Sequence, residues 1–323
     1  MEGGAHAVDV TIKQHLRKWI LSKVVEFVDE GGDGVAYGKL CNEVAGILQD
    51  HGENAKALEC YLKTLAIFEP LVGPDDESIA TITNNIGTVY EDTGDIDGAL
   101  EYYLKSLAIK EQVLDPEHPS TAQAYNNIGG IYKDKGDNEK ALTFLFKCLA
   151  IREKVLGPNH LGTANTANTL AGVLRSKGDI EQALEYYSKS LAVRENDAAC
   201  GPNHPDTAQS YNNIGLTYCD KNTDEDRDKA LEYLVKGLAI YEKVFGSKHG
   251  DTAGCLANIG TTYYRSGYID DSLQYYFRAL EIFEPSLGTT HPKTINTYNS
   301  IMWAYKSKGN ESEAQKWSDK ISK

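Results

Sequence analysis

Asparagine recurs at one position of this sequence with unusual regularity. Counted back ten residues from a series of turn glycines, that position holds Asn42, Asn84, Asn126, Asn168, Ala257 and Asn299, and Asn212 is its equivalent in one longer segment. Asparagine is a poor residue for a helix interior, because its side chain competes for the backbone's hydrogen bonds. Its repeated presence indicates that something offsets this cost.

Five of the eight histidines also share one position, in a loop that recurs along the chain: His118, His160, His204, His249 and His291. A metal site would need ligand atoms about 2 Å from one ion. Equivalent loops would be separated by a layer of helix, roughly 8–10 Å, so neighbouring histidines could not share a metal. We expect them to fasten the loops or to cap helices.

The sequence contains none of the common catalytic motifs. Gly-x-Ser-x-Gly, the phosphate-binding Gly-x4-Gly-Lys-Ser/Thr, His-Glu-x2-His and the dinucleotide fingerprint are all missing. The glycines fall instead at turns or at positions where helices pack. We therefore expect no enzyme activity, no cofactor and no metal.

A repeat positions these residues. The signature Gly-Asp-x3-Ala-Leu and its variants place a small residue at Ala57, Ala99, Ala141, Ala183, Ala230, Ser272 and Ala314, at spacings of 42, 42, 42, 47, 42 and 42. The longer spacing has two extra residues before Cys200 and three in the turn 222–228. Insertions confined to loops are typical of stacked units.

Each unit is predicted to form two helices. Tyr125, Ile128 and Tyr132 recur at helical spacing in a first helix, and Ala141 to Ile151 shows the same period in a second. Gly-Asp supplies a left-handed residue and then a helix start between them. Between units, segments such as Gly157-Pro158 break the helix. We expect Ser120, Asp206 and Asp251 each to cap the helix that follows such a segment.

These motifs resemble the tetratricopeptide repeat. Ile-Gly-x2-Tyr followed by Ala-x3-aromatic matches its pattern, with Tyr125, Tyr211 and Tyr298 where the consensus has tryptophan. The 42-residue period, the inter-repeat Leu-Gly-Pro-x-His segment and the following Tyr-Asn-Asn are similar to the repeats of kinesin light chains and of nephrocystin-like proteins. The resemblance implies an all-α fold, a right-handed superhelical solenoid of about seven helical hairpins.

The resemblance also implies a function for the asparagine row. In such arrays this row lines a concave groove, where the amides bond the backbone of an extended peptide. The implied peptide-binding residues are Asn84, Asn126, Asn127, Lys133, Asn168, Arg175, Asn212 and Asn213. Gly130 and Gly172 would leave room for the peptide, and the two basic residues would meet an acidic side chain or terminal carboxylate. The alternative is that the asparagines bond neighbouring repeats and specify their stacking.

One departure from the kinesin light chains concerns the N-terminal region. About 36 residues precede the first unit, with Ile12, Leu16, Ile20, Val24 and Phe27 at helical spacing but no sustained heptads. We expect residues 1–36 to form an amphipathic cap and linker and residues 37–323 to form the array. The heptad segment through which light chains join the motor is missing, so we expect an adaptor outside that role. The alternative is a structural subunit or scaffold that docks into a larger assembly, including a motor or cytoskeletal one, through its convex surface or its ends.

The composition restricts the class of partner and the cellular compartment that we expect. The chain has 33 Lys+Arg against 47 Asp+Glu, for a net charge of −14, which argues against nucleic acid as a partner. Six scattered cysteines without paired spacing indicate reduced thiols. The first 30 residues lack the order of a signal peptide, and their lysines and arginines exclude a membrane span. We expect a cytoplasmic protein that binds a protein or peptide.

Overall fold

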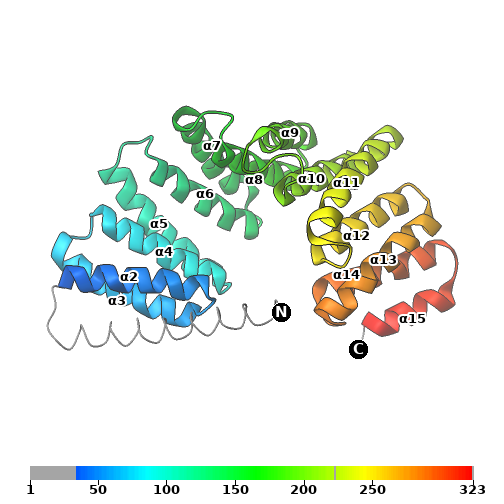
Figure 1. The fold of residues 1–323 in the computed structure, drawn as a ribbon, viewed down its shortest axis with the longest axis horizontal. Coiled ribbons are helices and arrows are strands. Elements are labelled where there is room, and N and C mark those ends of the chain that lie inside the picture. Colours follow the sequence, from blue (N-terminus) through cyan, green and yellow to red (C-terminus); the bar gives the residue numbers. More distant parts are fainter. Residues whose placement is uncertain (1–33, 222, 322–323) are drawn as a thin grey trace, which may run out of the picture. The chain divides into compact units, whose positions relative to one another are not determined.

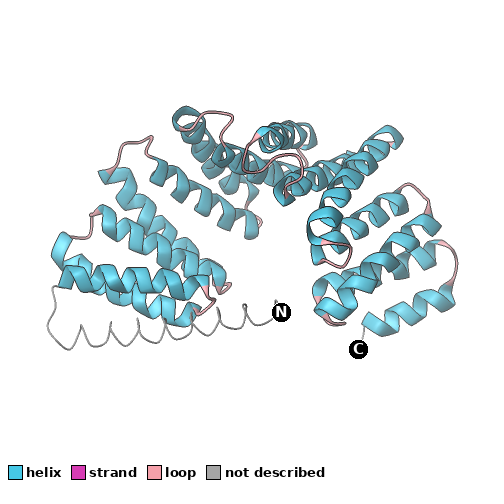
Figure 2. Cartoon of the chain, viewed as in Figure 1, coloured by secondary structure: helices cyan, strands magenta, loops and turns pink. Residues whose placement is uncertain are grey.

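The computed structural model describes residues 34–221 and 223–321. Over these residues the chain forms fourteen α-helices and no strand (Figures 1 and 2). Consecutive helices pair as seven hairpins, from α2 and α3 to α14 and α15. The predicted all-α array of helical hairpins is confirmed. Of the predicted N-terminal cap, residues 1–33 lie outside the described residues.

The chain divides into two compact units, residues 1–151 and 152–323. Unit 1 contains three first helices and the second helices that follow them: α2 (Gly34–Asp50), α3 (Asn54–Val72), α4 (Glu77–Asp92), α5 (Ile96–Val113), α6 (Pro119–Asp134) and most of α7 (Asn138–Val155). The first hairpin begins at Gly34, three residues before the predicted start of the array.

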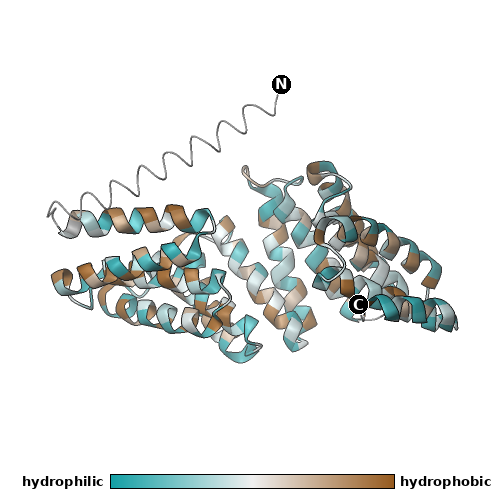
Figure 3. Ribbon diagram, turned by 90° about the horizontal axis from the view of Figure 1, so that it is seen from below, coloured by the Kyte–Doolittle hydropathy of each residue, from teal (hydrophilic) through white to brown (hydrophobic). Residues whose placement is uncertain are grey.

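Unit 2 begins in the last turn of α7 and contains four hairpins. Their helices are α8 (Leu161–Lys177), α9 (Ile180–Asn196), α10 (Pro205–Lys221), α11 (Asp224–Phe245), α12 (Gly250–Arg265), α13 (Ile269–Leu287), α14 (Pro292–Ser307) and α15 (Glu311–Ile321). In both units, apolar residues recur along one side of each helix and are buried between the paired helices (Figure 3).

The turns within the hairpins form as the Gly-Asp signature predicts. Gly94 adopts a left-handed conformation with φ 81°, and its N–H donates to the carbonyl of Glu91 at 3.0 Å. The next residue, Asp95, caps α5 by accepting a hydrogen bond from the N–H of Gly98 at 3.0 Å. A β-carbon at Gly94 would strain this conformation, so glycine is required at the turn.

The loops between hairpins end in a different cap from the one predicted. Each of the five loop histidines accepts a hydrogen bond through Nδ1 from the backbone N–H two residues later, at 2.9–3.2 Å. The prediction that Ser120, Asp206 and Asp251 cap these helices is therefore wrong. They supply the N–H, and the histidine before them supplies the acceptor. The expected role of the histidines in capping helices is confirmed.

Candidate functional site

The asparagine row lies on the first helices of the hairpins and is half-buried in both units. In unit 1 it contains Asn84 on α4 and Asn126 on α6. In unit 2 it contains Asn168 on α8 and Asn212 on α10. Each first helix packs against its own second helix beside this row; at Gly129 of α6, for example, a β-carbon would lie 2.7 Å from Cγ of Leu145. The row asparagines stay partly accessible, and we call the side of the first helices that carries them the first-helix face.

Hydrogen bonds link the asparagines of consecutive first helices. In unit 1, Nδ2 of Asn127 donates to Oδ1 of Asn84 at 3.3 Å. In unit 2, Nδ2 of Asn213 donates to Oδ1 of Asn168 at 3.2 Å, and Nδ2 of Asn258 donates to Oδ1 of Asn212 at 2.9 Å. The donor is always the asparagine one position after the row. Part of the amide chemistry thus joins repeats to one another.

A second set of contacts also joins consecutive first helices, about two helical turns further along each helix than the asparagine row. In unit 1, Nε2 of Gln49 donates to Oδ2 of Asp92 at 2.7 Å. In unit 2, Nε of Arg175 donates to Oδ2 of Asp220 at 2.6 Å. Tyr264 and Ser307, also in unit 2, share a hydrogen bond of 2.9 Å. Neighbouring first helices are therefore fixed at two levels by side chains of the first-helix face.

Several groups of this row keep hydrogen-bonding capacity. Asn84, Asn168 and Asn212 use Oδ1 as an acceptor, and the Nδ2 group of each has no partner among the described residues. Asn126 makes no side-chain hydrogen bond within the described part of its unit. An amide whose oxygen is held by a neighbour presents its two N–H donors in a fixed direction. These donors match the carbonyl groups of an extended peptide.

The two basic residues of the predicted site are both paired with carboxylates. Lys133 lies in unit 1, where its Nζ is 3.6 Å from a carboxylate oxygen of Asp134. Arg175 lies in unit 2 and binds Asp220, which also accepts from Nη1 of Arg265 at 3.1 Å. Sequence reasoning missed these partners and missed Asn258. The second asparagine of the Tyr-Asn-Asn motif was the available signal for Asn258, although the first asparagine is replaced by Ala257.

A groove of about 440 Å³ opens on the first-helix face of unit 2, over α10, α12 and α14. Asn212, Asn213 and Asn258 line it together with residues of opposite charge, Asp251 and Lys293. Aromatic side chains of the second helices, among them those of Tyr241, Tyr276 and Phe283, also line it. Most of the lining residues are polar, so the groove offers mainly hydrogen-bonding groups, with the aromatic rings as a smaller apolar part.

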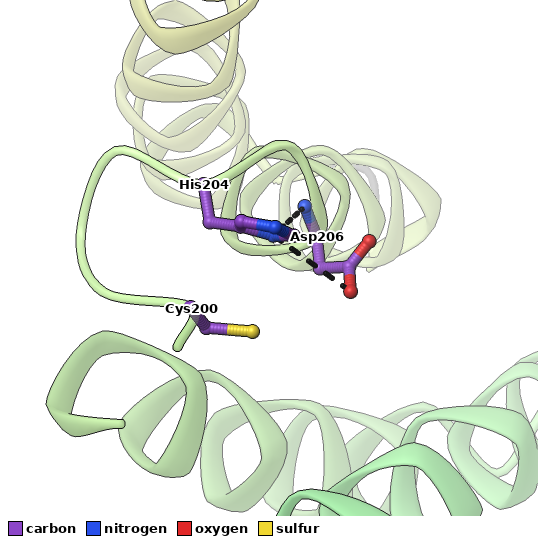
Figure 4. Close-up of side chains that lie close together, drawn as sticks. All are labelled: Cys200, His204 and Asp206. Carbon is purple, nitrogen blue, oxygen red and sulfur yellow. Dashed lines mark hydrogen bonds and ion pairs between the residues drawn. The ribbon is translucent and has the colours of Figure 1, made fainter. Parts of the chain in front are cut away.

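One cluster in the inter-repeat loops has metal-ligand chemistry. Ligand atoms of Cys200, His204 and Asp206 lie within 4.8 Å of one another (Figure 4). Nδ1 of His204, however, accepts from the backbone N–H of Asp206 at 3.2 Å. That lone pair would have to leave the cap to bind an ion at Nδ1. Burial also raises the pKa of the Cys200 thiol, which disfavours the thiolate that a metal requires. All six cysteines are free thiols, as expected.

No helix within the described ranges is long and apolar enough to cross a membrane. Comparison with known families matches the tetratricopeptide repeat at residues 38–112, 78–154 and 120–196, and again at 207–251 and 252–293. No curated protein sequence matches the chain significantly.

Solved structures share the fold. The apo form of RapI is 14% identical over 88% of this chain and 96% of its own, with a TM-score of 0.70. BtubC (BKLC) from P. vanneervenii is 18% identical over 70% of this chain and 89% of its own, with a TM-score of 0.58. TPR-like repeats assigned to a kinesin light chain of Podosopora anserina are 21% identical over 64% and 95%, with a TM-score of 0.53.

Proposed function

The chain belongs to the tetratricopeptide repeat family, and from that premise we propose that it is a non-catalytic adaptor whose first-helix face binds an extended peptide segment of another protein. Repeats of this family stack into extended surfaces that bind proteins or peptides. The observation that supports the proposal most is the unit 2 groove, because it combines fixed amide side chains with a partly aromatic lining.

The amide bonds between repeats are compatible with peptide binding. Each bond fixes Oδ1 of the row asparagine and leaves Nδ2 directed elsewhere, so the same side chain holds the stack and offers donors to a ligand. An isolated peptide must be ordered when it binds, which lowers its affinity. We expect a dissociation constant on the order of micromolar.

The groove test uses two glycines of α12. Gly254 lines the groove, and a β-carbon there would meet no atom within 4 Å. Gly250 lies one turn earlier on the same helix with equally free space and is not among the groove-lining residues. Gly254→Phe therefore fills the groove without disturbing the core, and Gly250→Phe is the matched control.

The experiment selects peptides that bind the wild-type protein from a random library with blocked termini. It then measures their affinity for the wild type, for Gly254→Phe and for Gly250→Phe. We expect Gly254→Phe to lose the enriched peptides and Gly250→Phe to keep them. Equal binding to both variants would place the peptide elsewhere. If no peptide is enriched, the proposed peptide-binding function is contradicted.

A second candidate function is docking into a larger assembly through the second helices of unit 1. Leu62 of α3 and Leu104 of α5 occupy equivalent positions, and each is 38% exposed. Apolar side chains exposed at repeat spacing favour a partner that spans several repeats. Leu62→Ser with Leu104→Ser should abolish such docking, and peptide binding in the groove should be unchanged.

A further inference from the structure

One position of the first helices is buried in every described hairpin except the first. It lies five residues after the asparagine row, where α4 has Val89, α6 has Ile131 and α8 has Val173, each 0% exposed. The residue at this position of α10, α12 and α14 is buried as well. In α2 the position holds Ile47, which is 41% exposed. An aliphatic side chain of α2 is thus uncovered where the later hairpins bury theirs.

The cover at this position comes from the preceding hairpin. Val89 belongs to an apolar cluster that includes Leu48 and Phe68 of the α2–α3 hairpin. In the same way, Ile131 of α6 belongs to a cluster that includes Tyr103 of α5. No hairpin precedes α2 within the described ranges. The side of α2 that would face such a hairpin is therefore open.

Two carboxylates lie on the same side of α2. The residues that recur there at helical spacing, which we call the α2 stripe, are Leu40, Glu43, Ile47 and Asp50. At the positions of Glu43 and Asp50 in later first helices, Asn127 and Asp220 bond the preceding first helix. Neither Glu43 nor Asp50 has a bonded partner among the described residues, and both are exposed. The stripe therefore offers aliphatic surface together with two free carboxylates.

The chain before α2 contains a segment whose composition complements this stripe. Residues 10–27 carry apolar residues at helical spacing, from Ile12 to Phe27. The basic residues among them are Lys13, Arg17, Lys18 and Lys23, and there is no carboxylate from residue 10 to residue 25. The chain as a whole has a net charge of −14, so this segment is locally basic in an acidic protein. Its charge is opposite to that of the stripe.

The segment also has the chain position of a second helix. Four residues separate α3 from α4, and five separate α5 from α6. Six residues separate residue 27 from Gly34, where α2 begins. Residues 10–27 are 18 in number, the length of α5. In the later repeats, the helix at this chain position belongs to the hairpin that covers the next first helix.

We infer that residues 10–27 pack on the α2 stripe, in the place that a preceding hairpin would take. Their apolar residues cover Leu40 and Ile47, and their basic residues lie beside Glu43 and Asp50. A repeat array needs its end covered, because each unit buries its apolar side only against a neighbour. The inference does not depend on peptide binding, since the stripe is separate from the unit 2 groove.

Hydrogen exchange followed by mass spectrometry tests this contact in the full chain. The measurement compares the amides of residues 10–27 in the protein with those of a synthetic peptide of the same residues. We expect exchange in the protein to be at least about tenfold slower, the effect of covering aliphatic side chains. Exchange as fast as in the peptide would overturn the inference.

Variants assign the protection to the stripe. Ile47→Ser should remove most of it, whereas Leu62→Ser should keep it, because Leu62 is similarly exposed, at 38%, but lies on α3. Glu43→Lys with Asp50→Lys should also remove protection, and the melting temperature of the array should change little because neither carboxylate has a described partner. Protection that persists in both α2 variants would contradict the contact.

Sedimentation of the wild-type protein and of Ile47→Ser distinguishes the segment from a second copy of the chain. We expect the wild type to keep its protection on dilution and both proteins to have the same oligomeric state. A wild-type dimer that Ile47→Ser dissociates, with protection that falls on dilution, would mean that a second copy covers the stripe. That result would overturn the inference.

Discussion

Asn127 of α6 donates a hydrogen bond from Nδ2 to Oδ1 of Asn84, which lies on the preceding first helix. The two residues are 43 positions apart, one more than the repeat period. The bond therefore joins the second asparagine of one repeat to the row asparagine of the repeat before it. The same relationship recurs twice in unit 2. The row is therefore part of the stack, and its free donors are what remains for a ligand.

Replacing Asn127, which donates this hydrogen bond, should lower the stability of the fold more than replacing its neighbour Asn126. Asn127→Ala leaves Oδ1 of Asn84 without its donor, so we expect a loss of about 1 kcal/mol. Asn126 makes no side-chain hydrogen bond within the described part of its unit, and Asn126→Ala should change stability by less. Urea unfolding followed by circular dichroism compares the two. Equal losses would show that the Asn127 bond does not stabilise the stack.

Adjacent glycines of α6 should respond in opposite directions to alanine. At Gly129 a β-carbon would lie 2.7 Å from Cγ of Leu145, so Gly129→Ala should destabilise by about 1–3 kcal/mol. At Gly130 it would meet no atom within 4 Å. Gly130→Ala should stabilise by up to about 1 kcal/mol, because alanine favours the helix. Thermal melting of both variants measures these changes. A Gly129→Ala protein as stable as the wild type would contradict the close packing of Gly129 against Leu145.

The histidine caps predict which replacements a loop tolerates. His160 accepts from the N–H of Gly162 at 2.9 Å. His160→Ala should cost about 1 kcal/mol, whereas His160→Asn should retain most of the stability because asparagine also accepts this hydrogen bond. Melting temperatures measure the difference. Two variants of equal stability would mean that the side-chain acceptor contributes nothing.

Alkaline pH should weaken the fold through its buried tyrosines. Burial, followed by the hydrogen bond to Glu111, raises the pKa of Tyr125 to about 12. In the unfolded chain a phenol has a pKa of about 10. The folded state therefore holds the proton more tightly between these values, and stability present below pH 10 falls as the pH rises through this window, by up to about 1.4 kcal/mol per pH unit. Tyr125→Phe should show a shallower fall in urea titrations from pH 9 to 12, and an identical slope would refute this origin.

The sequence was sufficient for the hairpins and insufficient for the contacts between them. The Gly-Asp turns and the period follow from local chemistry, since each turn needs a left-handed residue and a cap within a few positions. The loop cap was misassigned because His118 and Ser120 are both near the helix start, and only the backbone geometry shows which one accepts.

The site was predictable as a row and not as a set of partners. Asn84 and Asn126 could be placed on the same side of their helices from helical period alone. Pairing Arg175 with Asp220 required the register between neighbouring first helices, which sequence spacing does not contain.

The proposed function requires that the row asparagines donate to a ligand, and Asn212 allows the most direct measurement. Asn212→Asp keeps an oxygen for Nδ2 of Asn258 and removes the two donors that face the groove. Asn196→Asp adds the same charge on α9 at a residue outside the groove lining and serves as the control. The measurement is the dissociation constant of a library-selected peptide, by fluorescence polarisation. We expect Asn212→Asp to lose about tenfold in affinity with little change in melting temperature, and Asn196→Asp to keep its affinity. An unchanged affinity of Asn212→Asp would contradict it.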